Sequence, residues 1–224
     1  MTLAIGSAKA LPAGEYRLKE GEGTLVINAD HTFRIDILGT NTHTCNFEGK
    51  ISKEVSRIED SACYLRFKLK DADVSVTSEN RYSEDSELGC SSFCGLHAAF
   101  SGGVFLSLPK CTQSSVIKAR KVFKAQYDRK AYNQARQTLT TLLSSCAHVL
   151  HWTELGWIRN DLALAQYRTG NKKTCLATLK PLLVHATTPD EEFSIALLPM
   201  DADLMISLAK VTRTNLKLCS ASPP

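Results

Sequence analysis

A stretch of this 224-residue chain is repeated once at a spacing of 40 residues, beginning at Ala125 in the first copy and at Ala165 in the second. Each copy predicts a helix that ends near a Tyr, a break at residues 129–130 or 169–170, and a second helix with apolar residues at helical spacings. The pattern therefore predicts two helical hairpins in tandem. Because such repeats bury a face only against their neighbours, their usual product is a curved binding surface rather than a reaction centre. The identical positions of the first copy are Ala125, Gln126, Tyr127, Thr138, Leu139, Leu142 and Leu143.

The helical pattern extends beyond the repeat to most of the second half of the chain. Thr112 is expected to cap the first helix, Pro199 to break the chain, and Asp201 to cap the last helix. A short apolar turn is expected over residues 193–198. The predicted helices cover residues 113–128, 131–147, 152–169, 172–187 and 201–218.

The hundred residues before these helices have the two-residue period of β-strands. Phe33, Ile35 and Ile37 alternate with polar residues, and a similar alternation runs from Cys63 to Lys70. Strands joined by tight turns predict an antiparallel sheet curled into a small barrel or sandwich. The predicted strands cover residues 14–19, 23–28, 32–38, 43–51, 63–70, 74–77 and 103–108.

The expected fold class is therefore α+β, with two domains. An antiparallel β barrel or sandwich module over residues 13–109 precedes a module of α-helical hairpin repeats over residues 110–219. The polar, acidic run over residues 77–89 is expected to be an exposed loop.

Eight cysteines, an even and high number, fit either disulfides in an oxidising compartment or metal ligation in a reducing one. A zinc site needs pairs of close ligands, and only Cys90 and Cys94 lie close together. Disulfides are therefore expected, and no bound metal. The cysteines are Cys45, Cys63, Cys90, Cys94, Cys111, Cys146, Cys175 and Cys219.

In the β module we expect two disulfides. Cys45 and Cys63 are at inward-facing positions of two predicted strands. If these strands are neighbours, as we expect, a bridge between the two cysteines is favoured. Cys90 and Cys94 can pair with each other if the turn between them brings their Cα atoms within ~7 Å.

In the helical module the up-and-down order of the helices constrains the pairing. Cys111 and Cys146 lie at one end of the first hairpin, and Cys175 and Cys219 share the opposite end. A bridge from Cys146 to Cys175 would have to cross the third helix, a length of ~27 Å, and is excluded.

The N-terminus has the features of an export signal's tail. Leu3–Ile5 is apolar, and Ala8-Lys9-Ala10 matches a small-x-small cleavage site. Since the chain has no Asn-x-Ser/Thr site, we expect the bacterial periplasm rather than a eukaryotic secretory route. No apolar run approaches the ~20 residues of a membrane span. The net charge of +4 comes from basic residues interleaved with acids, so nucleic-acid binding is not expected.

Catalytic signatures are not found in the sequence. It has no Gly-x-Ser-x-Gly turn, no His-Glu-x-x-His pair and no Gly-rich phosphate loop before a helix. His148 and His151 are three residues apart, but exposed positions at a helix C-terminus explain them. We therefore expect a protein that is not an enzyme and that needs no cofactor.

The candidate partner-binding residues of the helical module are Trp152 and Trp157 together with Arg159 and Asn160. Trp and Arg dominate binding hot spots, which favours an anchoring role. The alternative is a buried Arg/Asp/Asn network that fixes helix packing, the role favoured for Asp161, because a buried charge needs a partner. The last helix offers Arg213 and Asn215 as partners.

The candidate partner-binding residues of the β module are Phe93 and His97, in and beside the loop from Gly89 to Gly95. One interpretation of this cysteine-bearing loop is a rigid protrusion that enters a partner's cleft. The other is a staple that replaces missing core in a small domain.

The helical half resembles tetratricopeptide-like repeats, which implies a repeat fold that binds peptides or proteins. It departs from that pattern in its period, 40 residues where ~34 is usual, and in having Lys130 where the second copy has Gly170. The resemblance is carried by Tyr127 and Tyr167, the small residues Ala135 and Cys175, Leu139 and Leu179, and Gly170.

The whole chain resembles exported bacterial proteins with a lysozyme-inhibitor-like β module followed by a helical region. The matching segments are residues 43–49, 90–95, 98–103 and 157–163. The resemblance implies protection of the cell envelope against wall-cleaving enzymes, including lysozyme-like hydrolases and type VI secretion effectors. The Ser-Gly-x-x-Tyr loop of one inhibitor class is absent, and only Ser101-Gly102-Gly103 approaches it.

Together these observations favour a non-catalytic periplasmic inhibitor or immunity protein that blocks a cell-wall-targeting toxin or hydrolase. A β loop or the helical groove would block the partner sterically, and disulfides would make the scaffold rigid. The alternative is an envelope assembly or scaffold protein that holds an extended peptide in its repeat groove. An enzyme with an unrecognised site is the third hypothesis.

Overall fold

The computed structural model describes residues 11–19, 22–82 and 89–220. The chain divides into two compact units, one extending to Gly39 and including His43–Pro109, the other Thr40–Thr42 with Lys110 onward. Residues 1–10, which contain most of the signal-like segment, lie outside the described residues. None of the described helices is both long and apolar enough to cross a membrane.

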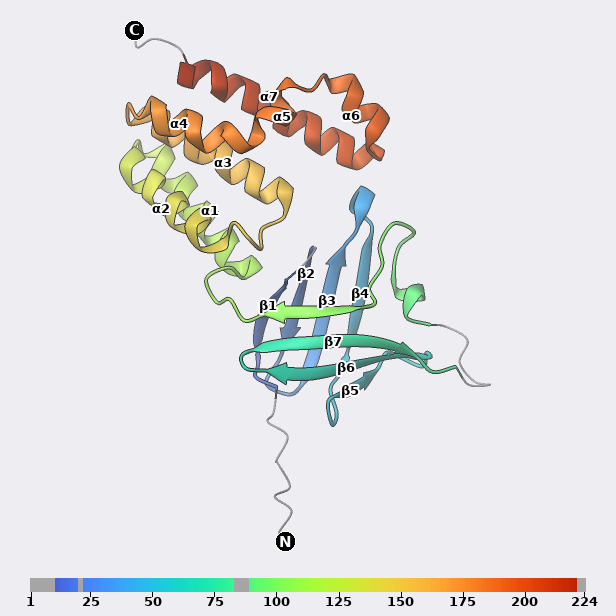
Figure 1. Ribbon diagram of the computed structural model, residues 1–224. Helices are drawn as coiled ribbons and strands as arrows, with labels where there is room; N and C mark the ends of the chain where they lie inside the picture. The colour runs from blue at the N-terminus through green and yellow to red at the C-terminus, as the bar shows by residue number, and fades with distance from the viewer. Residues whose placement is uncertain (1–10, 20–21, 83–88, 221–224) are drawn as a thin grey trace. The chain divides into compact units, whose positions relative to one another are not determined.

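The β unit is one antiparallel sheet in the strand order β4-β3-β2-β1-β8-β7-β6-β5. In Figure 1, β2, β3 and β4 run side by side, and β6, β7 and β8 cross them at a steep angle. The sheet therefore curls over on itself into a near-barrel. Its strands are β1 (Gly14–Leu18), β2 (Glu22–Ile27), β3 (Thr32–Leu38), β4 (Thr44–Lys50), β5 (Val55–Arg57), β6 (Cys63–Lys70), β7 (Asp73–Asn80) and β8 (Gly102–Leu106).

The core of this unit follows from the alternation along its strands. Phe33, Ile35 and Ile37 are all buried, while Arg34 between them is exposed. The rings of Phe33 on β3 and Phe67 on β6 lie 4.8 Å apart and edge to face. Because β3 and β6 belong to the two crossing halves of the sheet, one core serves both halves.

Two features of the sheet differ from the sequence prediction. The short strand β5 was not predicted, and it follows Lys53 and Glu54, which both have positive φ. β7 continues through Asn80, into the run expected to be a loop, because it pairs with β6 along its whole length. Backbone pairing, rather than apolar alternation, extends this strand. The rest of the acidic run, residues 83–88, lies outside the described residues.

The helical unit begins at α1, where Thr112 accepts a hydrogen bond from the Ser115 amide and forms the predicted N-cap. The predicted helix over 172–187 is interrupted, because Pro181 has no amide hydrogen and a 3-10 turn surrounds it. Pro199 was expected to break the chain but begins α7, since the first turn of a helix tolerates Pro. The predicted apolar turn is mostly helix α6. The helices are α1 (Gln113–Asp128), α2 (Tyr132–Cys146), α3 (Trp152–Arg168), α4 (Lys172–Leu179), α5 (Leu183–Thr187), α6 (Asp190–Ala196) and α7 (Pro199–Ser220).

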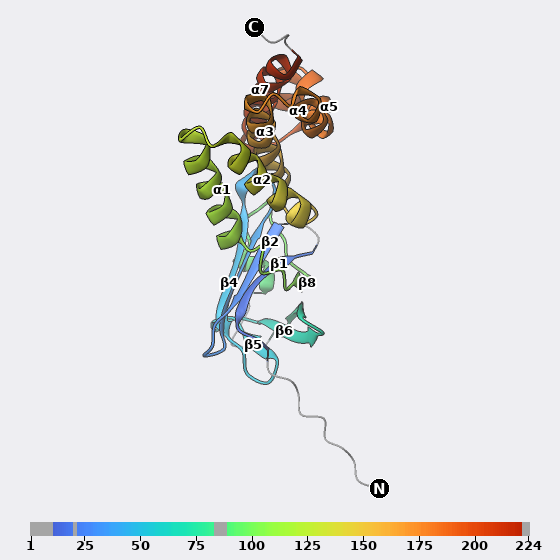
Figure 2. The same cartoon turned by 90° about the vertical axis from the view of Figure 1, so that its left-hand side faces the viewer.

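These helices pack in a row, α1 on α2, α2 on α3 and α3 on α4, with α7 against both α3 and α4. In both views α1 and α7 lie at opposite ends of this unit (Figures 1 and 2). Gly156 allows the close approach of α3 and α7, because a Cβ there would lie 2.5 Å from Leu208 Cδ2.

The two copies of the repeat share one local structure at the break between their helices. Lys130 and Gly170 occupy equivalent positions and have φ values of 63° and 76°. The following amides, of Ala131 and Asn171, donate to carbonyls five residues back, both at 2.9 Å. Each first helix therefore ends in the same Schellman motif, with glycine in only one copy.

All eight cysteines form disulfides, which is consistent with an oxidising, exported compartment. The predicted bridges Cys111–Cys146 and Cys175–Cys219 of the helical unit are confirmed, with Cα atoms 5.4 and 5.9 Å apart.

The two bridges predicted for the β unit are wrong. The structure pairs Cys45 with Cys94 and Cys63 with Cys90, at Cα separations of 3.9 and 4.5 Å. β4 is at one end of the sheet and β6 is next to the other end, so the strands that carry Cys45 and Cys63 are not neighbours.

Candidate functional site

The residues that precede β8 are attached by disulfides to strands on both halves of the sheet. We call residues 89–101 the stapled loop. Its Cys90 is bonded to β6 and its Cys94 to β4, and a 3-10 turn separates the two cysteines. The loop therefore has a covalent anchor on each half of the near-barrel.

Aromatic packing also holds the stapled loop on the sheet. Phe93 and Phe100 both pack against Phe47, with ring centroids 5.8 and 5.6 Å from it. The Cys90 amide donates to Asn80 Oδ1 at 2.7 Å. The structure thus places Phe93, a predicted contact residue, half-buried where it anchors the loop.

Beyond Cys94 the backbone turns sharply and is fixed by hydrogen bonds. The Gly95 amide donates to the Thr44 carbonyl, and the Ala98 amide closes a turn on the Gly95 carbonyl, both at 2.9 Å. The His97 amide donates to His43 Nδ1 at 3.3 Å, and the two imidazole rings lie 4.9 Å apart.

The turn between β3 and β4 packs closely against this part of the loop. A Cβ at Gly39 would overlap the His97 carbonyl oxygen and contact Ala98, so only glycine permits this approach. The backbone from Cys94 to Ala98 is consequently fixed by a disulfide, three hydrogen bonds and a backbone contact.

Leu96 lies in this fixed turn with 86% of its surface exposed. Single exposed apolar residues are common on protein surfaces and by themselves indicate nothing. Here, however, the residues on both sides of Leu96 are held in place. Binding of a partner to Leu96 would therefore cost little conformational entropy in this loop. The sequence prediction chose Phe93 and His97 and missed Leu96, although it is the one large apolar residue between Gly95 and Ala98.

Asn160, predicted for partner binding, is buried between α3 and α7. Its Nδ2 donates to Thr212 Oγ1 and to the Gly156 carbonyl, and Asn215 Nδ2 donates to its Oδ1, all at 3.0 Å. Of the Arg/Asp/Asn network expected as the alternative, these contacts include only Asn160 and Asn215, because Arg159 and Asp161 bond to other helices. The Arg213 guanidinium donates to Asp190 at 2.7 Å, an ion pair that lowers the pKa of the Asp190 carboxyl.

The other predicted residues of the helical unit do not converge on one surface. Trp152 is exposed at the first position of α3, and Trp157 is half-buried five residues later. Arg159 donates to the Thr178 carbonyl of α4, while its Nε has no hydrogen-bond partner among the described residues. Burial lowers the pKa of this guanidinium. Successive residues on a helix point in different directions, which explains the divergence.

Asp161 faces α1, where its carboxylate lies 3.6 Å from the Arg120 guanidinium. Burial raises the pKa of Asp161, and the charge and hydrogen bond of Arg120 partly offset the rise. A hollow of about 510 Å³ lies at this contact. We call it the α1–α3 groove, lined by Ile117, Arg120, Phe123, Tyr127, Asp161 and Leu164 among others.

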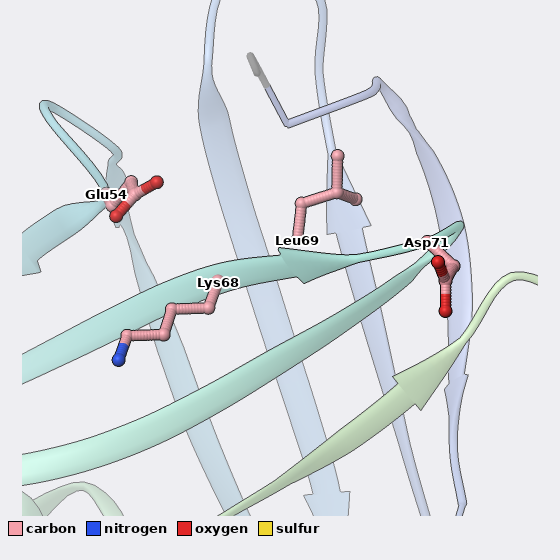
Figure 3. A pocket seen from close by; sticks show the side chains of 4 residues that line it. All are labelled: Glu54, Lys68, Leu69 and Asp71. Atoms are coloured by element: carbon pink, nitrogen blue, oxygen red, sulfur yellow. The ribbon is translucent and has the colours of Figure 1, made fainter. Parts of the chain in front are cut away.

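A second hollow, of about 460 Å³, lies at the hairpin ends of the β unit. Figure 3 shows Glu54 and Asp71 at opposite ends of it, with Lys68 and Leu69 between them. The two carboxylates do not point toward one another, so they form no cation site. Across the described residues, no group of three or more His, Cys, Asp or Glu side chains is arranged to hold a metal ion.

No protein-family model, curated protein or solved structure matches this chain.

Proposed function

We propose that this protein is a non-catalytic inhibitor of a cell-wall-cleaving enzyme or toxin in the bacterial periplasm, and that the stapled loop enters the partner's substrate cleft. The observation that carries the proposal is the 86% exposed Leu96 on a backbone held from both sides. The lysozyme-inhibitor-like resemblance of the same loop supports it.

The inhibition would be steric. An enzyme that cleaves the wall polymer needs an open cleft, and an apolar side chain on a rigid turn can occupy such a cleft without being a substrate. Burial of one Leu side chain contributes about 1.5–3 kcal/mol. Because the disulfides fix the loop in the free protein, most of this energy would appear as affinity.

We further propose that the helix pairs of the second unit are tetratricopeptide-like repeats. Positions 135 and 175 are both fully buried, as are Leu139 and Leu179, so the two copies use the same faces for packing. The shared Schellman motif after α1 and α3 supports the same interpretation.

The test is inhibition of purified muramidase, amidase and endopeptidase acting on isolated cell-wall sacculi, followed by turbidity. We expect stoichiometric inhibition of one of these classes. Leu96→Asp should weaken the inhibition about 30-fold or more, as expected for a hot spot. Ile195→Asp is the matched control, since Ile195 on α6 is also 86% exposed.

Two results would contradict the proposal. One is the absence of inhibition of all three enzyme classes at micromolar protein. The other is inhibition that Leu96→Asp leaves at the level of the Ile195→Asp control.

A further inference from the structure

The last helix of the molecule has an uncharged stripe along its exposed side. α7 lies at the end of the helical unit opposite α1 in both views (Figures 1 and 2). The outer face of a terminal helix in a helical array is usually polar, because it faces water. On α7, uncharged residues instead recur at alternating spacings of four and three, and each of them is exposed or half-buried. We call these residues the α7 stripe: Met200, Leu204, Ser207, Val211, Thr214 and Leu218.

Alternating spacings of four and three are the pattern of a coiled-coil seam, the line of residues along which one helix packs on another. Seven residues nearly complete two turns of an α-helix, so residues with this spacing stay on one face. Met200 is 48% exposed, and Leu204 and Val211 are each 36% exposed. The α7 stripe is therefore suited to pack against one more helix.

One flank of the α7 stripe is occupied by contacts within the helical unit. Asp201 accepts a hydrogen bond from the Asn41 amide at 2.8 Å. Leu208 is buried, and Asn215 donates to Asn160 Oδ1 at 3.0 Å. The three α7 residues of this flank are spaced seven residues apart, so the flank is closed along most of the stripe.

The other flank of the α7 stripe has exposed charges of both signs. Asp203 and Lys210 are seven residues apart, which places them on the same side of the helix. Lys210 Nζ lies 3.5 Å from Asp190 Oδ2, and the lysine side chain is still 64% exposed. Because an ammonium group has three donors, Lys210 can bond a second carboxylate. This flank can therefore pair with a partner that has one positive and one negative charge two turns apart.

A second copy of α7 has these two charges. If two α7 helices pack antiparallel about a two-fold axis between residues 205 and 206, Leu204 lies beside Ser207 of the second copy. Asp203 of each helix then lies beside Lys210 of the other, and symmetry forms this pair twice. In the antiparallel register shifted by one heptad, the two Lys210 side chains would meet. Parallel helices would separate Asp203 from Lys210 of the second copy by ~10 Å along the axis.

We propose that the protein forms an antiparallel homodimer through the α7 stripe, with Asp203 of each copy paired to Lys210 of the other. The α7 stripe and the stapled loop share no residue, so this association does not rest on the inhibition proposed for the loop. A standard interface uses about 20–30 residues on each side, far more than the stripe provides. We therefore expect a reversible dimer with a dissociation constant in the micromolar range.

The experiment is sedimentation equilibrium of the oxidised full-length protein at neutral pH, from micromolar to near-millimolar concentration. We expect the average mass to rise reversibly from that of one chain toward that of two. Leu204→Glu should weaken association at least tenfold, because the dimer would bury its carboxylate without a partner. Ser207→Glu should do the same at a position that is exposed in the monomer. Lys173→Glu, at an exposed position of α4, is the matched control and should leave association unchanged.

Exchange of the two charges tests the antiparallel arrangement. Asp203→Lys alone and Lys210→Asp alone should each weaken association about tenfold, because each turns two attractive pairs into two repulsive ones. The double variant restores both pairs with their signs reversed. Its dissociation constant should return to within about threefold of the wild-type value.

Circular dichroism and thermal unfolding of the dilute variants confirm that each is folded. A wild-type protein that remains monomeric at every concentration would overturn the proposal, and so would a dimer that neither Leu204→Glu nor Ser207→Glu weakens. A double charge variant that associates no better than the single variants would exclude the antiparallel pairing.

Discussion

Each unit of the molecule has two disulfides, but the disulfides join different kinds of segment. In the β unit, Cys45–Cys94 and Cys63–Cys90 attach a surface loop to strands that are far apart in the sheet. In the helical unit, Cys111–Cys146 joins the beginning of one helix to the end of its packed neighbour.

The difference indicates two roles for the same bond. Helices that already pack on one another gain stability from a disulfide and little new geometry. A loop without a regular backbone pattern gains its conformation from the disulfide, and with it the ability to present Leu96.

Removal of one disulfide from each unit tests the distinction directly. We expect Cys111→Ala with Cys146→Ala to lower the free energy of unfolding by about 2–4 kcal/mol and to leave inhibition intact. Cys45→Ala with Cys94→Ala should lower inhibition at least tenfold at a temperature where the protein is folded. Urea denaturation and the turbidity assay measure the two quantities. Equal loss of inhibition in both double variants would refute the division of roles.

Removal of the buried hydrogen-bond network between α3 and α7 tests how much interactions other than disulfides contribute to the stability of the helical unit. Asn160→Ala leaves Thr212 and Asn215 without their buried partner, so we expect a loss of about 1–3 kcal/mol in unfolding free energy. Asn133→Ala, at an exposed position of α2, is the control. An Asn160→Ala variant as stable as this control would show that the network contributes nothing.

The two repeat copies provide a matched pair for backbone strain. Lys130→Gly should stabilise the protein by about 0.5–1 kcal/mol, because a non-glycine residue at φ 63° is strained. Gly170→Ala should destabilise it by a similar amount, although a Cβ there has nothing within 4 Å. Thermal unfolding of both variants measures the effect, and shifts of the same sign would contradict it.

The ion pair at the start of α6 predicts a dependence of stability on pH. The hydrogen bond from Arg213 lowers the pKa of Asp190 in the folded state. Its stabilising contribution is therefore complete above the pKa of an unfolded Asp and is lost as the pH falls through the lower, folded value. Asp190→Asn should be less stable than the wild type at pH 7, with the difference vanishing in acid. A difference that is constant with pH would exclude this role.

The sequence predicted the helical unit better than the β unit, for a physical reason. The bounds of α1 follow from the local spacing of apolar residues. The Cys111–Cys146 pair follows from the antiparallel order of two adjacent helices. The partners of Cys45 and Cys63 depend on which strands become neighbours after the sheet curls, and no local pattern contains that information.

The same limit applies to the candidate site. The sequence indicated the cysteine-bearing loop, including Phe93, but its conformation depends on contacts with β4 and with the turn at Gly39. Exposure of Leu96 is a consequence of those distant contacts. Asn160 was ambiguous because its partners are on α7, about fifty residues away in the chain.

A photoreactive p-benzoylphenylalanine at position 96 tests directly whether the stapled loop enters the substrate cleft: the complex with the inhibited wall-cleaving enzyme is irradiated, and the cross-linked peptide is identified by mass spectrometry. We expect cross-links to peptides that line the enzyme's substrate cleft, and none from the same group at position 195. Cross-links from position 96 only to surfaces outside the cleft, or an equal yield from both positions, would contradict this expectation.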